Sequence, residues 1–179
     1  IPLCGLAGKV NSQDNKTEKR TIIHAGNIYG KRSIDQLNEA VTQAKTMIDD
    51  LHEKLEILLY GTVCVGYERV LSMSNNDIIK FCGCLSQDDL REKMKTADAL
   101  LLIDPIDENN YCFPSKLCEY FQYDKIIIGI AGLNTPSYDA LKESGHIVSD
   151  SNDISKISDA IVSIANNKKS IRSKIDKSY

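Results

Sequence analysis

Residues 111–120 read YCFPSKLCEY and lie between two wholly apolar runs, ALLLI at 99–103 and IIIGI at 126–130. Strands that are covered on both faces of a sheet lose the alternating polar pattern, so both runs are predicted to be buried parallel strands. A polar loop, a proline and then a helical pattern follow the first run. Pro114 is therefore predicted at the first helical position, where its missing N–H leaves no hydrogen bond unmade.

The first turn of that predicted helix has the features of an anion site. Its N–H groups have no partner inside the helix and carry partial positive charge, which suits a phosphate. Lys116 opposes the helix dipole there unless an anion shares the site. One turn on, Glu119 is able to accept hydrogen bonds from a pair of sugar hydroxyls. The structural alternative is an ordinary helix start followed by a solvated glutamate.

Strands and helices alternate along the whole chain, which is typical of a parallel sheet with helices on both faces. Right-handed crossovers favour a doubly wound α/β fold with strand order 3-2-1-4-5-6. The predicted strands are residues 21–25, 56–60, 78–81, 99–103, 125–130 and 146–148. The predicted helices are residues 34–51, 67–73, 86–96, 114–123, 137–143 and 153–166. Residues 1–20 are interpreted as a linker, 21–166 as one domain, and 167–179 as a basic tail or a crossing helix.

In this strand order the first and fourth strands are neighbours, and ligands bind beyond the carboxyl ends of strands at such a point. The loop after the first strand contains Gly26, which lets backbone approach a ligand, and the cations Lys31 and Arg32, which can reach phosphate oxygens. A polar turn with a solvated basic pair is the alternative. His24 could contact phosphate or transfer a proton, although such a histidine is more often structural.

The loop after the fourth strand is acidic, with Asp104, Asp107 and Glu108. These carboxylates could bind a metal or sugar hydroxyls, but a solvated loop is favoured. The glycine that follows the second predicted strand, Gly61, is interpreted as ordinary turn chemistry.

Composition restricts the classes of function. The 179 residues suit one domain, and a net charge of −3 with a pI near 5.6 argues against a general nucleic-acid binder. No apolar run approaches the roughly 20 residues of a membrane-spanning helix. The six cysteines contain no CxxC pair and are predicted to be mostly buried, reduced thiols, which suits a cytoplasmic setting. Because the chain starts at Ile1 without a methionine, we expect a fragment of a longer protein.

Five segments in succession resemble a known family. The chain looks like the C-terminal, nucleotide-sugar-binding domain of a GT-B glycosyltransferase and is similar to glycosyltransferase family 4, over roughly residues 21–166. The segments are IIHAGNIY at 22–29, LLYG at 58–61, IKFCGCLS at 79–86, TADALLLI at 96–103 and FPSKLCEY at 113–120. The last resembles the proline-serine-lysine variant of the family's donor-binding motif.

The resemblance implies a role for each matching residue. Glu119 would bond the ribose hydroxyls, and Ser115, Lys116 and the helix N–H groups would hold the diphosphate or the donor sugar. Arg32 or Lys31 would add positive charge beside Gly26, and backbone near Leu85 would meet the base. No catalytic residue, metal or further cofactor is expected, because the nucleotide-diphosphate sugar is itself the substrate.

One departure from the family's pattern affects the expected function. Many members carry two glutamates eight positions apart in this motif, and Tyr111 stands at the first position here. The identity of the sugar and the level of activity are therefore left open.

The resemblance implies a retaining sugar transfer in glycan or polysaccharide biosynthesis, in partnership with an acceptor-binding N-terminal domain that the sequence lacks. This half alone is expected to bind donor but to transfer little or nothing. The alternatives are a non-catalytic nucleotide-binding or interaction module and a sugar-nucleotide epimerase, although the epimerase His-Arg-Arg-Glu-Asn loop is absent. We expect a cytoplasmic protein and leave a peripheral membrane contact open.

Overall fold

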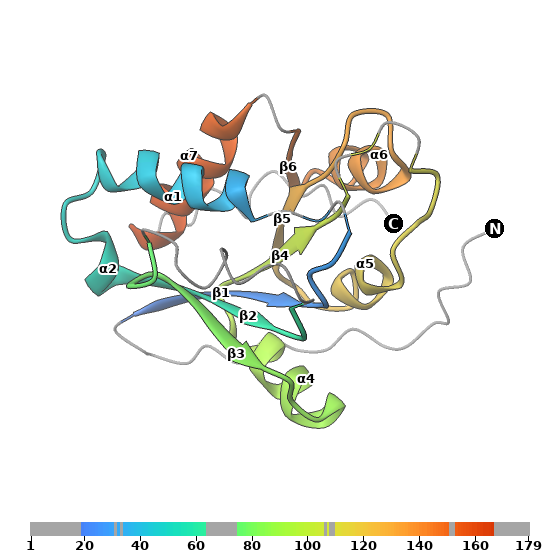
Figure 1. Cartoon of the computed structure of the whole chain (residues 1–179), viewed down its shortest axis with the longest axis horizontal. Coiled ribbons are helices and arrows are strands. Elements are labelled where there is room, and N and C mark those ends of the chain that lie inside the picture. The colour runs from blue at the N-terminus through green and yellow to red at the C-terminus, as the bar shows by residue number, and fades with distance from the viewer. Residues whose placement is uncertain are drawn as a thin grey trace.

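The computed structural model describes residues 19–30, 32, 34–63, 75–105, 107, 110–150 and 153–166. These residues form a six-stranded, all-parallel sheet with helices on both faces (Figure 1). The strand order β3-β2-β1-β4-β5-β6 confirms the predicted topology. The strands are β1 Arg20–Ala25, β2 Leu55–Tyr60, β3 Ile79–Gly83, β4 Ala99–Ile103, β5 Ile126–Ile130 and β6 Ile147–Ser149.

The helices within the described ranges are short and separate into two layers. They are α1 Asp35–Lys45, α2 Leu51–Lys54, α4 Gln87–Thr96, α5 Ser115–Tyr120, α6 Pro136–Glu143 and α7 Ile154–Ala165. Buried side chains of α1, α2 and α7 pack on one face of the sheet, and those of α4, α5 and α6 pack on the other. Successive residues of β1 alternate accordingly, with Ile22 in the first layer and Ile23 in the second.

The predicted helix over residues 34–51 is wrong in its extent. The helix ends at Lys45, and a turn follows in which Met47 N–H and Ile48 N–H both donate to the Ala44 carbonyl. Ile48 and Leu51 are nevertheless buried in the same core layer as α1. The apolar spacing therefore indicates that residues before and after the turn are buried, but it does not reveal the turn itself. The predicted helix over residues 67–73 lies outside the described residues.

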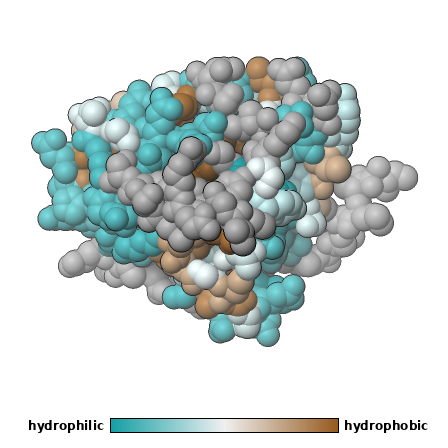
Figure 2. Space-filling model, viewed as in Figure 1, coloured by the Kyte–Doolittle hydropathy of each residue, from teal (hydrophilic) through white to brown (hydrophobic). Residues whose placement is uncertain are grey.

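The prediction of buried cysteines is wrong for most of those described. Cys82, Cys84 and Cys112 are exposed free thiols, and Cys118 is partly buried. Cys82 and Cys84 lie at the carboxyl end of β3, which is an edge strand of the sheet that the described residues form. Figure 2 shows an apolar area over β3 and α4 on an otherwise largely hydrophilic face. Cys4 and Cys64 lie outside the described residues.

No described helix has the length and apolar character needed to cross a membrane.

Candidate anion-binding site

A cavity of about 390 Å³ opens where the first and fourth strands separate. β1 and β4 pair at Ile22 with Ala99 and at Ile23 with Leu100, and no further residue pairs join them. The cavity lies beyond this last pair, as the switch-point rule predicts. Its lining comes from three segments that are distant in sequence: His24, Ala25, Gly26, Asn27, Tyr29 and Arg32; Leu102, Ile103 and Asp104; Pro114, Ser115, Lys116 and Tyr120.

Tyr120 bridges the two strands at the floor of this cavity. Its hydroxyl accepts a hydrogen bond from Ala25 N–H at 2.8 Å and lies 3.3 Å from the Leu101 carbonyl, to which it donates. The Tyr120 side chain is fully buried, and burial raises the pKa of its hydroxyl, which therefore keeps its proton. A side chain thus replaces the missing strand pairing and fixes α5 against the sheet.

Replacing Tyr120 by phenylalanine should cost about 1–3 kcal/mol of stability, because it leaves the buried Ala25 N–H without a partner. Urea unfolding monitored by circular dichroism measures the change. Tyr111→Phe is the matched control, since Tyr111 is 78% exposed and should change stability by less than about 0.5 kcal/mol. Equal effects of the two changes would show that the Tyr120 hydroxyl has no bridging role.

The loop after β1 turns back tightly and brings Arg32 to the cavity. Arg32 N–H donates to the Tyr29 carbonyl at 3.1 Å, and Gly30 within this turn has a φ of 61°. At the start of the loop, the Asn27 side chain accepts a hydrogen bond from Thr62 N–H at 2.9 Å. The loop is therefore held against the end of β2, and its basic side chain is not simply solvated. Lys31, the other predicted cation, lies outside the described residues.

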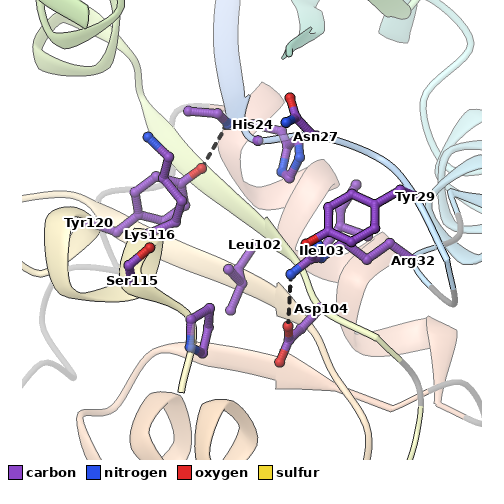
Figure 3. A pocket seen from close by; sticks show the side chains of 13 residues that line it. His24, Asn27, Tyr29, Arg32, Leu102, Ile103, Asp104, Ser115, Lys116 and Tyr120 are labelled. Carbon is purple, nitrogen blue, oxygen red and sulfur yellow. Dashed lines mark hydrogen bonds and ion pairs between the residues drawn. The ribbon is translucent and has the colours of Figure 1, made fainter. Parts of the chain in front are cut away.

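Two groups position the Arg32 guanidinium. It lies 3.8 Å from a carboxylate oxygen of Asp104 and 4.6 Å from the centre of the Tyr29 ring, over which it packs (Figure 3). A guanidinium so oriented keeps further N–H donors for an anion.

Asp104 contradicts the prediction of a solvated acidic loop. Its side chain is 2% exposed and accepts hydrogen bonds from the Ser137 hydroxyl and from the Asn110 amide at 3.3 Å. Burial raises the pKa of this carboxyl, while the Ser137 hydrogen bond and the Arg32 charge act in the opposite direction. No cluster of three or more metal-ligand side chains occurs in the described ranges, and Glu108 lies outside them.

The structure corrects the helix predicted to begin at Pro114. Pro114 is the N-cap, with an extended ψ of 127°, and α5 occupies Ser115–Tyr120 without reaching Tyr123. A six-residue helix has a small dipole, so the cavity's positive potential depends mainly on side-chain charges. Ser115 and Lys116 do line the cavity, as predicted.

Lys116 and Glu119 form an ion pair. The sequence analysis did not predict this pair, because it gave the two residues separate roles. Their charged groups are 3.0 Å apart, and Arg91 lies 3.9 Å from the other oxygen of Glu119. Lys116 lines the cavity, whereas Glu119 does not. Glu119 is therefore outside the cavity wall and is linked to it through the Lys116 ammonium group.

Leu85 is 39% exposed and is not part of the cavity wall. It directly precedes Ser86, whose side chain caps α4. A role of its backbone in meeting a base stays a prediction.

His24 is a buried ionisable group of the cavity wall, like Asp104 and Tyr120. Its Nδ1 lies 3.0 Å from the Leu101 carbonyl, and its Nε2 has no hydrogen-bond partner among the residues that the structure describes. Burial lowers the pKa of His24 to about 4, and the charges of Arg32 and Lys116 act in the same direction. The ring is therefore neutral at pH 7.

Sequence reasoning missed Tyr120 and Tyr29 as parts of the site, and it favoured a solvated position for Asp104. One signal was available for Tyr120, since it lies four residues after Lys116 and therefore on the same helix face. The burial of Asp104 depends on Ser137, and neither local spacing nor charge pattern predicts that contact.

The cavity combines two cations on opposite walls, and Figure 3 shows Lys116 on the side of α5 and Arg32 on the side of the β1 loop. Of the carboxylates described, Asp104 alone lines the cavity, and it already contacts Arg32. The arrangement is suited to a small anion with several oxygens.

No family model and no curated protein matches the sequence. Solved structures do match. TarM superimposes with a TM-score of 0.67 at 12% identity, covering 97% of this chain and 35% of TarM. The C-terminal domain of LpcC, a group 1 glycosyl transferase from Francisella tularensis, gives 0.62 at 11% identity, covering 92% and 89%. The catalytic domain of the Helicobacter pylori cholesterol-α-glucosyltransferase gives 0.65 at 15% identity, covering 88% and 93%. The chain has the fold of a GT-B half-domain.

This GT-B half-domain spans about a third of the length of TarM. Two solved structures of longer, similar chains contain a nucleotide. S. aureus TarM has been solved in a complex that includes UDP, and Anabaena HepE has been solved with UDP. This chain covers 33% and 45% of those proteins, at TM-scores of 0.60 and 0.56.

Proposed function

We propose that this GT-B half-domain binds the nucleotide-diphosphate sugar of a retaining glycosyltransferase in glycan or polysaccharide biosynthesis. The observation that carries the proposal is the cavity at the switch point, with Arg32 and Lys116 on opposite walls. The two cations come from different elements, so their convergence is a property of the fold. The UDP complexes of TarM and HepE support a nucleotide as the ligand class.

The diphosphate is the leaving group of such a transfer, and its developing negative charge needs fixed positive groups. Arg32 offers two or more N–H donors in a planar fork, whereas Lys116 supplies a single mobile ammonium group. The Ser115 hydroxyl and the backbone N–H groups of Ser115 and Lys116 add neutral donors. We expect these groups to suffice without a metal, so removal of divalent ions with EDTA should leave binding unchanged.

The ribose is assigned to Glu119, with the base toward Leu85. For this to occur, Lys116 must move from the Glu119 carboxylate to the phosphate, which frees that carboxylate to accept from the ribose hydroxyls. The exchange is inexpensive because the ion pair is partly exposed, and exposed pairs contribute about 0–1 kcal/mol.

Transfer requires an acceptor-binding half that completes the cleft, so the isolated chain should bind donor with little turnover. A binding module without transfer is the second candidate. Tyr111, which occupies the position of the first glutamate of the family's motif, favours it because its side chain is 78% exposed and does not line the cavity.

Isothermal titration calorimetry of the 179-residue chain with UDP, GDP, ADP and inorganic pyrophosphate tests the binding proposal. At least one nucleoside diphosphate should bind more tightly than pyrophosphate. Absence of heat with every ligand would overturn the proposal. Transfer and binding alone are then distinguished by adding an acceptor-binding half and assaying sugar release from the nucleotide-diphosphate sugar of the nucleotide that binds.

Substitutions at Lys116 and Glu119 should separate their two roles. Lys116→Ala should weaken nucleoside diphosphate and pyrophosphate alike, by about tenfold, because a charged hydrogen bond to phosphate is lost. Glu119→Ala should weaken the nucleoside diphosphate by a similar factor but leave pyrophosphate unchanged or slightly tighter, since it releases Lys116. Calorimetry measures both, with Lys80→Ala as a control at an exposed lysine paired to Glu56. Equal effects of both substitutions on both ligands would show that the roles are assigned wrongly.

A further inference from the structure

The buried ring of His24 lies on the cavity wall between the Lys116 side and the Arg32 side (Figure 3). Because Nδ1 faces the Leu101 carbonyl at 3.0 Å, this nitrogen carries the ring's proton. Nε2 is then an unprotonated nitrogen with no hydrogen-bond partner in the described part of the chain. Three buried side-chain polar atoms in the described ranges lack a partner, and Nε2 is the one whose residue lines the cavity.

In a protonated His24, both N–H groups of the ring would be stabilised by backbone carbonyls. The Gly26 carbonyl makes no hydrogen bond with Nε2 in the described structure, but the Gly26 backbone raises the pKa of the ring, as does the Leu101 carbonyl at Nδ1. What opposes the charged ring is burial together with the like charges of Arg32 and Lys116. An anion between these two cations removes their repulsion and adds an attraction.

We propose that His24 takes up one proton when a diphosphate binds in this cavity, and then acts as a third cation toward it. The inference rests on the proposed function, because it takes the diphosphate as the ligand. The proton comes from solvent and goes to Nε2, and no other bond is made or broken. The leaving diphosphate then lies beside three positive groups, which are Arg32, Lys116 and His24. The positive charge of His24 is present only while the ligand is bound.

The other titratable residues that line the cavity with His24 are Tyr29, Arg32, Asp104, Lys116 and Tyr120. The two cations and the two tyrosine hydroxyls cannot accept a proton at neutral pH. Asp104 can, because burial raises the pKa of its carboxyl and a bound anion would compete for Arg32. An experiment on proton uptake must therefore separate His24 from Asp104.

Calorimetry with UDP-glucose and GDP-mannose as probes measures the uptake. Both are diphosphate diesters, so neither has the phosphate ionisation near pH 6 that UDP has. At pH 6, in buffers of different ionisation enthalpy, uptake should approach one proton per bound ligand. Since binding raises the pKa of His24 from about 4, affinity should rise as pH falls from 8 to 6, by up to about tenfold per pH unit.

Three variants assign the proton. His24→Gln should abolish the uptake and the pH dependence. His146→Gln is the matched control, since burial lowers the pKa of His146 to about 4 as well and His146 does not line the cavity. Asp104→Asn should retain the uptake. Loss of uptake in Asp104→Asn, or retention in His24→Gln, would overturn the proposal.

Should His24→Gln fail to fold, nitrogen-15 NMR of the wild-type ring gives the same answer. The Nε2 signal should move from an unprotonated to a protonated shift when the probe is added. Binding with no such movement would overturn this inference and leave the proposed function intact. Absence of binding by both probes and by every nucleoside diphosphate tested above would overturn the inference and the proposed function together.

Discussion

Replacing Arg32 by alanine is expected to weaken UDP binding about 10- to 100-fold, and pyrophosphate binding by the same factor. A charged hydrogen bond to phosphate contributes about 1.5–3 kcal/mol, and each 1.4 kcal/mol is about a factor of ten. A second effect of the substitution weakens binding further. Without Arg32 the buried Asp104 carboxylate, which lies 3.8 Å from the guanidinium, would face the diphosphate without a neutralising partner.

Two further variants separate these losses by calorimetry. Arg32→Lys keeps the charge but loses the planar fork, and should give an intermediate affinity. Adding Asp104→Asn to Arg32→Ala should recover part of the affinity, because the amide can still bond to Ser137 and carries no charge. If Arg32→Ala binds as tightly as the wild type, the cavity does not hold the diphosphate.

Replacing Gly61 by alanine is expected to destabilise the fold by about 3–5 kcal/mol, or to prevent folding. A Cβ at this position would overlap the Gly26 carbonyl oxygen and lie 2.6 Å from the carbonyl carbon. The φ of 140° belongs to a backbone region that is essentially restricted to glycine, which costs about 1–3 kcal/mol, and overpacking adds a similar amount. The interpretation of Gly61 as ordinary turn chemistry agrees with its positive φ but does not include this close packing against Gly26.

Gly83→Ala and Gly30→Ala are matched controls for this substitution. Their φ angles are also positive, at 69° and 61°, but no described atom lies within 4 Å of an added Cβ. Each should cost about 1–2 kcal/mol through backbone strain alone. Urea unfolding measures all three variants. A Gly61→Ala protein as stable as Gly83→Ala would show that close packing of Gly61 on the cavity loop is not important.

The fold was predictable because its strongest signals are local. The apolar runs at 99–103 and 126–130 are β4 and β5, and the rule on crossover handedness supplied the strand order. The limits of α5 were harder to predict from the sequence. Tyr123 continues the apolar spacing and is buried, but its N–H bonds to the Tyr120 carbonyl, three residues back, in a turn after the helix.

The candidate site also has some features that the sequence predicts and others that it does not. The presence of Arg32 and Lys116 at one cavity followed from topology, and the Lys116–Glu119 pair was available from their spacing of three residues on a helix. The contacts that position these groups join distant residues. Tyr120 meets Ala25 across 95 positions, and Ser137 meets Asp104 across 33. Such contacts follow from packing, and a single sequence has no pattern that encodes them.

A crystal structure of the chain with UDP tests the central claim most directly. The account predicts diphosphate oxygens within about 3 Å of the Arg32 guanidinium and the Lys116 ammonium, with the ribose hydroxyls at Glu119. UDP bound at another part of the surface, or with its diphosphate outside the cavity between β1 and β4, would contradict it.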